Sequence, residues 1–199
     1  MTTTLARTPE DKPALRRTLI EWRNSLSPDV REAAERSMST HLIALATQHP
    51  IWTVAAYWPM RGEPRLDAAW QALRDRDVAL ALPAVVKPNA PMEFRLWQPD
   101  ALMTKDECGV PTPLEAPVVN DIDVLVVPCV GYHPRGYRLG YGGGYFDRTL
   151  ITLRPAPYVI GVAFSGQLCR FTPDPHDVPL DAIVTERGGL MLADMAPRV

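Results

Sequence analysis

A glycine-rich run follows the most strand-like segment of this chain, and this pairing constrains the fold more than any other feature. Residues 123–128 are mostly apolar and β-branched and end in proline, which is typical of a buried strand. The run RLGYGGGYFDR occupies residues 138–148, and residues 145–153 can form a short helix that ends before Pro155. A strand, a glycine loop and a helix in this order predict an α/β unit with the loop at the carboxyl end of the strand.

The glycine loop has the composition of an anion site. Its glycines permit positive φ and a close approach of ligand to backbone, and the first turn of the following helix offers free N–H groups. Arg138 and Arg148 add forked donors for phosphate oxygens, and Asp147 is placed to hold Mg²⁺ beside phosphates. The run matches neither the GxGxxG fingerprint, which would need glycine in place of Tyr145, nor the P-loop. The alternative is a plain glycine-rich turn with solvated arginines.

The loop resembles the signature R-L-G-x-G-x-G-[YF]-[YF]-D of the 5-formyltetrahydrofolate cyclo-ligase family, also called methenyltetrahydrofolate synthetases. Three further motifs support the resemblance and occur in the family's order. They are Lys12-x-x-Leu15-Arg16, the run YWPMRGEP at residues 57–64 and the run HDVPLD at residues 176–181. Together the four motifs extend the resemblance over nearly the whole chain.

The resemblance implies an ATP- and Mg²⁺-dependent ring closure of 5-formyltetrahydrofolate to 5,10-methenyltetrahydrofolate, with release of ADP and phosphate. The metal positions of the family match Asp147 and Asp177. The nucleotide-contacting positions match Lys12, Arg16, Arg138, Leu139, Gly140, Tyr141, Gly142, Gly143, Gly144, Tyr145 and Phe146. The folate-contacting positions match Trp58, Glu63, Tyr141, Gly142, Gly143, Gly144 and Tyr145.

The implied chemistry needs no protein nucleophile, because transfer of the γ-phosphate of ATP turns the formyl oxygen into a leaving group that N10 can displace. Catalysis would then depend on positioning and charge stabilisation. Arg138 and Arg148, with Lys12 and Arg16, would stabilise the transferring phosphoryl group. Glu63 would either accept donors from the pterin ring or orient the reacting end of the substrate.

The sequence departs from part of the family inside the loop. Tyr141 and Gly143 stand where some relatives have basic residues, and Phe146 stands where tyrosine is common. A hydroxyl at position 146 is therefore not required here, and charge for the phosphates must come from elsewhere. Without the resemblance, Lys12 reads as a solvated lysine at a helix start, Trp58 as core packing and Asp177 as a turn residue among prolines.

Composition narrows the function classes. The 199 residues are 46% hydrophobic and contain no recognisable linker or repeat, so one domain over residues 1–199 is expected. A net charge of −2 with scattered arginines disfavours nucleic acid, and three cysteines without C-x-x-C spacing disfavour a disulfide framework or structural zinc. Residues 1–17 contain no apolar signal segment, and no stretch is apolar enough to span a membrane. We expect a cytoplasmic monomer that acts on a small-molecule folate, polyglutamylated or not.

The segments expected to form regular structure alternate along the chain. Helices are expected at residues 13–26, 28–48, 66–76 and 145–153, and strands at 51–57, 78–82, 92–97, 123–127, 158–164 and 182–185, with an irregular stretch at 99–117. This order predicts a three-layer α/β/α sandwich with a largely parallel sheet, and the family's fold is similar to those of sugar-phosphate isomerases and CoA-transferases. Residues 58–63 and 138–147 would then share one cleft at the carboxyl ends of the strands.

Two other functions remain open on the sequence. A sugar-phosphate isomerase or CoA-transferase-like enzyme would need a positioned base or glutamate nucleophile, for which no motif is found. A paralogue that binds folate or nucleotide without turnover is the second alternative. The joint presence of Lys12, Arg16, Glu63 and Asp147 favours the catalyst.

Overall fold

The computed structural model describes residues 11–48 and 50–191 and has a seven-stranded sheet at its centre. The predictions made for residues 1–10 and 192–199 lie outside these described residues. The strand order is β11-β10-β9-β6-β1-β2-β3. The strands are β1 (Thr53–Ala55), β2 (Ala79–Ala84), β3 (Glu93–Trp97), β6 (Val124–Pro128), β9 (Tyr158–Val162), β10 (Ala182–Thr185) and β11 (Gly188–Met191).

The five inner strands run parallel, and the two edge strands run antiparallel to their neighbours. β6 lies in the middle and is buried along its whole length, as its run of β-branched residues predicts. Parallel inner strands bring their carboxyl ends to one edge of the sheet, and this edge is where ligands gather in such folds.

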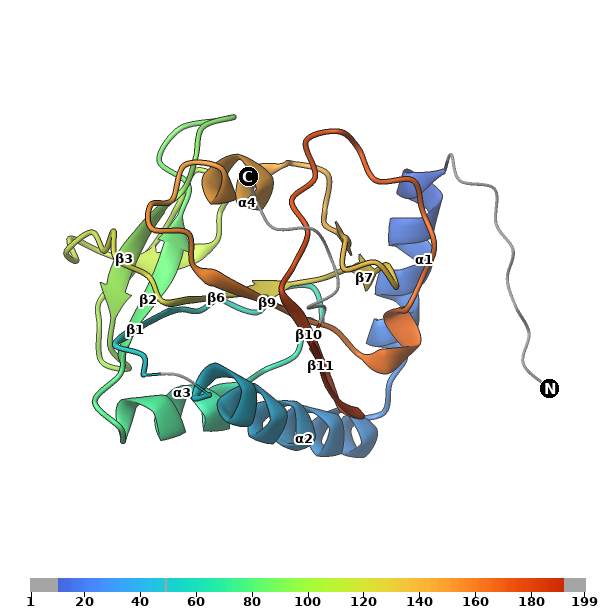
Figure 1. Cartoon of the computed structure of the whole chain (residues 1–199), viewed down its shortest axis with the longest axis horizontal. Helices are drawn as coiled ribbons and strands as arrows, with labels where there is room; N and C mark the ends of the chain where they lie inside the picture. The colour runs from blue at the N-terminus through green and yellow to red at the C-terminus, as the bar shows by residue number, and fades with distance from the viewer. Residues whose placement is uncertain (1–10, 49, 192–199) are drawn as a thin grey trace.

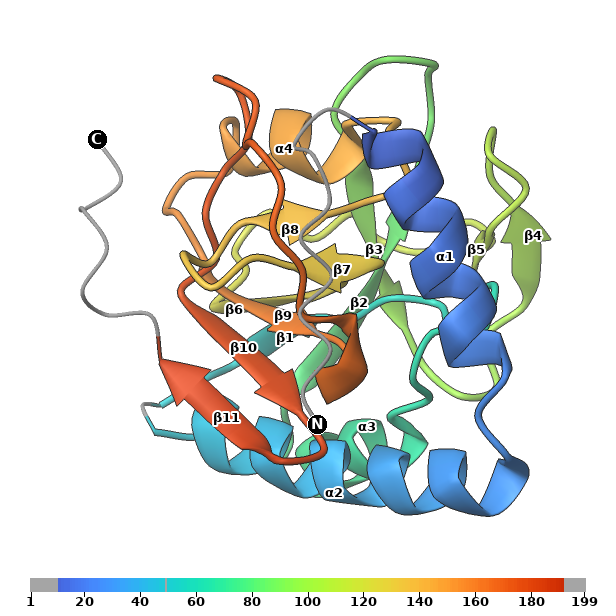
Figure 2. The ribbon, with the colours of Figure 1, turned by 90° about the vertical axis from the view of Figure 1, so that its right-hand side faces the viewer.

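Helices α2 (Pro28–Ala46) and α3 (Asp67–Arg74) cover one face of the sheet, and α4 (Tyr145–Leu150) lies over the other (Figure 1). The longest helix after α2 is α1 (Lys12–Asn24), which runs alongside the glycine-loop region at the end of the sheet (Figure 2). A short 3₁₀ turn, η1 (Ser165–Gln167), follows β9. The predicted three-layer α/β class with a largely parallel sheet is confirmed. No described helix is long and apolar enough to cross a membrane.

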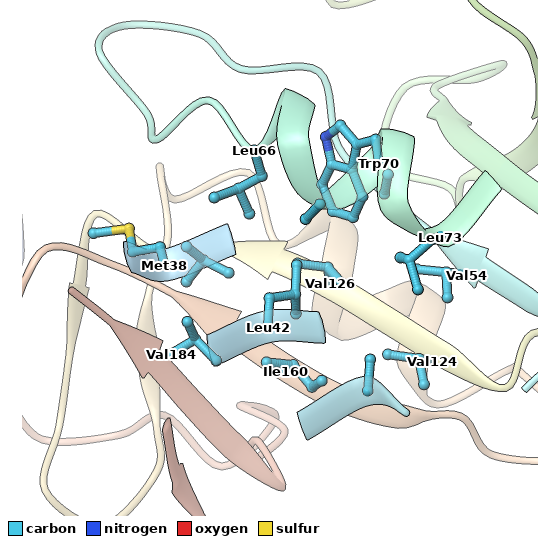
Figure 3. Close-up of a cluster of buried hydrophobic side chains, with 14 of the residues drawn as sticks. Met38, Leu42, Val54, Leu66, Trp70, Leu73, Val124, Val126, Ile160 and Val184 are labelled. Carbon is cyan, nitrogen blue, oxygen red and sulfur yellow. The ribbon is translucent and has the colours of Figure 1, made fainter. Parts of the chain in front are cut away.

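Alternation along the strands divides the core between the two faces. Val124 and Val126 of β6 face Leu42 of α2 and Trp70 of α3 (Figure 3). The intervening Leu125 and Val127 face the other side, where Leu150 of α4 packs. Successive residues of β6 therefore pack against helices on opposite faces of the sheet. This packing positions both helical layers relative to the carboxyl edge of the sheet.

Several element ends differ from the expected ranges by up to three residues, and three features of the topology differ as well. A hairpin of β7 (Gly131–Tyr132) and β8 (Arg138–Leu139) intervenes between β6 and the glycine loop, so the loop does not follow the strand directly. The stretch 99–117, expected to be irregular, contains a second hairpin of β4 (Met103–Lys105) and β5 (Pro111–Pro113). β11 was not foreseen, because its glycines at 188 and 189 have low strand propensity.

Asp106 explains why the second hairpin forms in a segment rich in proline. Its Oδ1 accepts from the backbone N–H groups of Cys108 and Val110, and its Oδ2 accepts from that of Val85. One carboxylate thus organises the turn and ties it to the end of β2. Ser27 begins α2 as expected, but its side chain forms no capping hydrogen bond.

Candidate active site

A cavity of about 420 Å³ opens at the carboxyl edge of the sheet. Its walls come from the turn after β1, the ends of β2 and β6, the glycine loop and α1, so motifs distant in sequence share one cleft as predicted. The predicted site residues that line it are Lys12, Arg16, Trp58, Glu63, Arg138, Leu139, Gly140, Tyr141, Gly142, Gly143, Gly144, Tyr145, Phe146, Asp147 and Asp177. Arg148 is the predicted residue that the structure does not bring to the wall.

The glycines of the loop are required for two different reasons. Gly142 has φ +96° and Gly144 has φ +66°, a region that L side chains rarely adopt. At Gly140 the limit is space, because a Cβ there would lie 2.6 Å from Arg138 Nη1. The loop therefore packs directly against the side chains of Arg138 and Arg148. Its glycines leave the loop backbone accessible from the cavity.

Arg138 lies at the base of the loop, with its side chain only 6% exposed. Its Nη2 donates to Asp147 Oδ2 at 2.6 Å, and its guanidinium stacks over the Phe146 ring with 5.1 Å to the centroid. Its Nε has no partner among the described residues. A buried, ion-paired arginine in the cavity wall supplies a fixed positive charge that is suited to hold an anion.

Arg148 stabilises the loop from outside the cavity. Its Nη2 donates to the carbonyl of Gly143 at 2.6 Å, and its guanidinium stacks over the Tyr145 ring with 4.9 Å to the centroid. The structure thus gives Arg148 a role in fixing the backbone conformation of the loop.

The basic residues of α1 face the same loop. Arg16 Nε donates to the carbonyl of Gly140 at 2.7 Å, which ties α1 to the loop. Lys12 Nζ lies 2.6 Å from Asp174 Oδ2 and 3.8 Å from Asp177 Oδ2. Lys12 and Arg16 therefore both lie at the cavity. Lys12 pairs with Asp174, a carboxylate that the sequence did not single out, and lies near Asp177.

The two predicted metal-binding carboxylates lie on neighbouring segments. Asp147 Oδ1 accepts from the backbone N–H of Val178, which places the residue after Asp177 beside Asp147. Arg138 pairs with Asp147 and Lys12 lies near Asp177, and the described residues contain no group of three or more His, Cys, Asp or Glu side chains able to hold a metal. This donor set does not form a resident metal cage. It fits Mg²⁺ that arrives with phosphates, since Mg²⁺ commonly uses one or two carboxylates together with substrate oxygens.

Glu63 is the most deeply buried carboxylate of the cavity, at 3% exposure. It ends a tight turn in which Arg61 and Gly62 both have positive φ. Oε2 accepts from the backbone N–H of Met60 at 2.9 Å, and Oε1 accepts from the Tyr141 hydroxyl at 2.9 Å. Burial raises the pKa of Glu63, whereas the Met60 N–H, the Tyr141 hydroxyl and two nearby arginines act in the opposite direction.

Trp58 is half-buried. It packs against the core and also lines the cavity.

Several cavity residues were missed by the sequence reasoning. Arg61 stands inside the motif at 57–64 but was given no role, and Asp106 and Cys108 come from the stretch expected to be irregular. Arg23, fully buried behind the cavity, follows Arg16 by two helical turns, so the spacing of basic residues on α1 was a usable signal. The residues near 106 carried no such signal, because their place depends on the tertiary path of the hairpin.

Comparison with known proteins gives one consistent result. The profile of the 5-formyltetrahydrofolate cyclo-ligase family matches residues 8–186. A 5-formyltetrahydrofolate cyclo-ligase from Mycoplasma pneumoniae is 30% identical over 178 residues, 88% of this chain and 99% of the relative. One from Mycolicibacterium smegmatis is 30% identical, covering 92% and 97%.

Solved structures agree with these relatives. A 5,10-methenyltetrahydrofolate synthetase from Mycoplasma pneumoniae superposes with a TM-score of 0.75 at 30% identity, covering 88% of this chain and 99% of that one. The corresponding synthetase from Aquifex aeolicus gives a TM-score of 0.75 at 30% identity, covering 95% and 96%. The expected similarity to sugar-phosphate isomerases and CoA-transferases is not confirmed by these neighbours.

Proposed function

Because the chain belongs to the 5-formyltetrahydrofolate cyclo-ligase family, we propose that it converts 5-formyltetrahydrofolate and ATP to 5,10-methenyltetrahydrofolate, ADP and phosphate. One observation carries the proposal. The basic residues of α1, the glycine loop and the Glu63 turn, each matching a different family motif, line a single cavity.

The reaction has two steps, a phosphoryl transfer and a ring closure. The formyl oxygen of the substrate attacks the γ-phosphorus of ATP, ADP leaves, and the formyl carbon now carries a phosphate leaving group. N10 then attacks this carbon, the C–O bond breaks, phosphate departs with the former formyl oxygen, and N10 loses its proton. Both steps depend on holding charged oxygens in line, and the chain supplies positive groups for this purpose.

On the nucleotide side, the exposed backbone of the glycine loop and the positive charge of Arg138 in the cavity wall are suited to phosphate oxygens. Lys12 and Arg16 face the same space from α1 and add positive charge. Asp147 and Asp177 would hold Mg²⁺ that enters with the nucleotide, and the ion would supply further charge neutralisation beside the phosphates. Arg148 contributes by holding the Gly143 carbonyl.

On the folate side, Glu63 accepts hydrogen bonds from within the protein and retains lone pairs that a ligand donor can use. Trp58 presents a flat ring at the cavity for stacking against the pterin. The loop residues 141–145 are placed to contact both the nucleotide and the folate, because the loop lies between α1 and Glu63 in the cavity wall.

We also propose that the protein acts as a monomer in the cytoplasm. A monomer would suffice for the proposed reaction, because residues of all four family motifs line one cavity of a single chain. The cytoplasm is supported by three cysteines that form no disulfide. Size-exclusion chromatography with light scattering at assay concentration tests the first point, and a dimer would contradict it.

The test of the function is direct. The purified protein is mixed with 5-formyltetrahydrofolate and Mg-ATP, and the absorbance of the methenyl product is followed. We expect product only when ATP is present. Product without ATP, or none with it, would contradict the proposal, and binding of both ligands without product would identify a non-catalytic paralogue.

A further inference from the structure

We propose that Arg23 and Tyr141 are positioning residues, which orient Glu63 as a hydrogen-bond acceptor through a directed chain of hydrogen bonds and thereby couple the glycine loop to the Glu63 turn. The inference rests on the proposed function, because it concerns how the folate side of that same cavity is set. Tyr141 lines the cavity, whereas Arg23 lies behind it.

The first link of this chain of hydrogen bonds has only one possible direction. Arg23 Nη2 donates to the Tyr141 hydroxyl at 2.5 Å, and a guanidinium can only donate. The single proton of that hydroxyl is therefore free to point to Glu63 Oε1, at 2.9 Å. The other oxygen of Glu63 already accepts from the Met60 N–H. Both carboxylate oxygens accept hydrogen bonds in this arrangement, which favours the ionised form of Glu63.

Arg23 is held too firmly to serve any solvent-exposed role. It is fully buried, and its Nε donates to the carbonyl of Arg61 at 2.9 Å. Its own carbonyl accepts from Arg31, which also donates to the carbonyl of Gly62 at 2.9 Å. Its Nη1 has no partner among the described residues. A buried charge that contacts two parts of the cavity wall is suited to fix their relative position.

The Glu63 turn depends on the same contacts. A Cβ at Gly62 would lie 2.0 Å from Asn24 Oδ1, so the turn packs tightly against the end of α1. The Arg61 guanidinium lies over the Tyr141 ring with 5.2 Å to the centroid, and that of Arg23 with 5.8 Å. Tyr141 is thus held through its ring and through its hydroxyl, and its position in the glycine loop links the nucleotide side to the folate side.

The charges around Glu63 agree with this role. Burial, the largest influence, raises its pKa, and the Met60 N–H and the Tyr141 hydroxyl lower it, followed by Arg23 and Arg61. Tyr57 and Cys129 also face it, and burial raises the pKa of both, so they stay neutral near neutral pH. The charged and titratable groups around Glu63 and its turn are Arg23 from α1, Arg31 from α2, Arg61, Tyr57, Cys129 and Tyr141. Removing the Tyr141 hydroxyl should raise the pKa of Glu63.

The test is Tyr141→Phe, which removes the hydroxyl and keeps the ring between the arginines. We expect kcat/KM for 5-formyltetrahydrofolate to fall about tenfold at neutral pH, and the acid limb of its pH profile to move up by about one unit. The KM for ATP should change by less than about twofold, because the phosphate contacts remain. An unchanged acid limb would overturn the proposal.

A double-mutant cycle shows whether Tyr141 acts through Glu63. If it does, Tyr141→Phe should have little further effect on kcat/KM in a Glu63→Gln background, since the group it positions is gone. Fully additive losses would overturn the proposal. Arg23→Lys keeps the charge but cannot reach both Tyr141 and the Arg61 carbonyl, so it should move the acid limb in the same direction as Tyr141→Phe.

Tyr137→Phe is the matched control, because Tyr137 belongs to the β7–β8 turn and does not line the cavity. It should leave the pH profile unchanged, and a shift equal to that of Tyr141→Phe would overturn the proposal. Ligand-free melting temperatures separate structure from positioning, and a fall of more than about 10 °C for Tyr141→Phe would assign the residue a structural role instead. Absence of turnover in the unmodified protein would refute the proposed function and the inference with it, whereas an active protein with an unmoved acid limb refutes the inference alone.

Discussion

Asp147 connects two parts of the cavity through one carboxylate. Oδ2 pairs with Arg138 of β8, and Oδ1 accepts from the backbone N–H of Val178. The residue therefore holds the base of the glycine loop to the segment that carries Asp177. A carboxylate in this place has both a structural and a chemical role, and the two can be separated because asparagine retains an acceptor oxygen.

Asp147→Asn should lose most of the activity, with kcat falling about 100-fold or more, because an amide cannot supply the negative charge that Mg²⁺ beside phosphates requires. The melting temperature should fall only by a few degrees, roughly 2–8 °C, because the amide oxygen still accepts from Arg138. Steady-state assays over a range of Mg²⁺ concentrations measure the first effect. Turnover equal to that of the unmodified protein at every concentration would refute the metal role.

Glu63→Gln should weaken folate binding more than nucleotide binding, because Glu63 follows β1, whereas the phosphates are assigned to the glycine loop. We expect about a tenfold loss of affinity for 5-formyltetrahydrofolate and less than about a twofold change for ATP. Calorimetric titration of each ligand alone checks this division. A similar loss for both ligands would show that the two halves of the cavity are not separate.

The pH dependence of activity should follow the ionisation of Glu63. Burial raises its pKa from the ordinary value of 4.5, so kcat/KM for the folate should decline as pH falls through a range above 4.5. A raised folded-state pKa means that the folded protein binds this proton more readily than the unfolded chain, so protonation of Glu63 does not itself destabilise the fold. Activity should therefore fall before the melting temperature does. A parallel decline of both would assign the acid limb to unfolding.

At the scale of elements, α1 and the glycine loop form one unit. Arg16 Nε donates to the Gly140 carbonyl, and Leu19 packs in a small core cluster with Leu139. The loop is thus supported by a helix that lies more than a hundred residues earlier in the chain. Changes in α1 should therefore appear in nucleotide affinity.

Replacing Lys12 and Arg16 together by glutamine should raise the apparent KM for ATP by about tenfold or more, because two charge-assisted contacts to phosphates are lost. Ligand-free stability should change little on account of Lys12, whose partner Asp174 is 69% exposed. The KM and the melting temperature are the two measurements. An unchanged KM would return both residues to an ordinary role in the helix.

Gly142→Ala tests the backbone of the loop itself. At φ +96° alanine is strained, and its Cβ would lie 3.4 Å from Arg16 Cζ, so the loop must change shape. We expect ATP affinity to fall about tenfold or more. Gly188→Ala, at φ +144° with open space around it, is the control with comparable strain away from the cavity. Equal effects of the two variants on ATP affinity would contradict the role of the loop.

Elements with a clear local pattern were predictable, and those fixed by distant contacts were not. β6 and α3 lie close to their expected positions, because β-branched runs and amphipathic spacing act locally. The β4–β5 hairpin depends on Asp106 reaching Val85, and the β7–β8 hairpin on pairing across a turn. The resemblance to the family indicated Lys12, Arg16 and Glu63 for the site, but Arg23 acquires its contact with Tyr141 only through folding.

At the scale of the whole molecule, four motifs spread from residue 12 to residue 181 meet at one edge of a largely parallel sheet. The sheet makes this possible, since the carboxyl ends of β1, β2 and β6 point to the same side (Figure 1). The proposed reaction needs this convergence, because the formyl oxygen and the γ-phosphate must meet in line.

The fate of the formyl oxygen tests this account most directly. 5-Formyltetrahydrofolate carrying a heavy oxygen isotope in its formyl group is converted with unlabelled ATP, and the released phosphate is analysed by mass spectrometry. Transfer of the γ-phosphate to the formyl oxygen predicts one labelled oxygen in every phosphate released, with ADP and methenyl product formed in equal amounts. Unlabelled phosphate, or label appearing in water, would contradict the assignment of this cavity to phosphorylation of the formyl group.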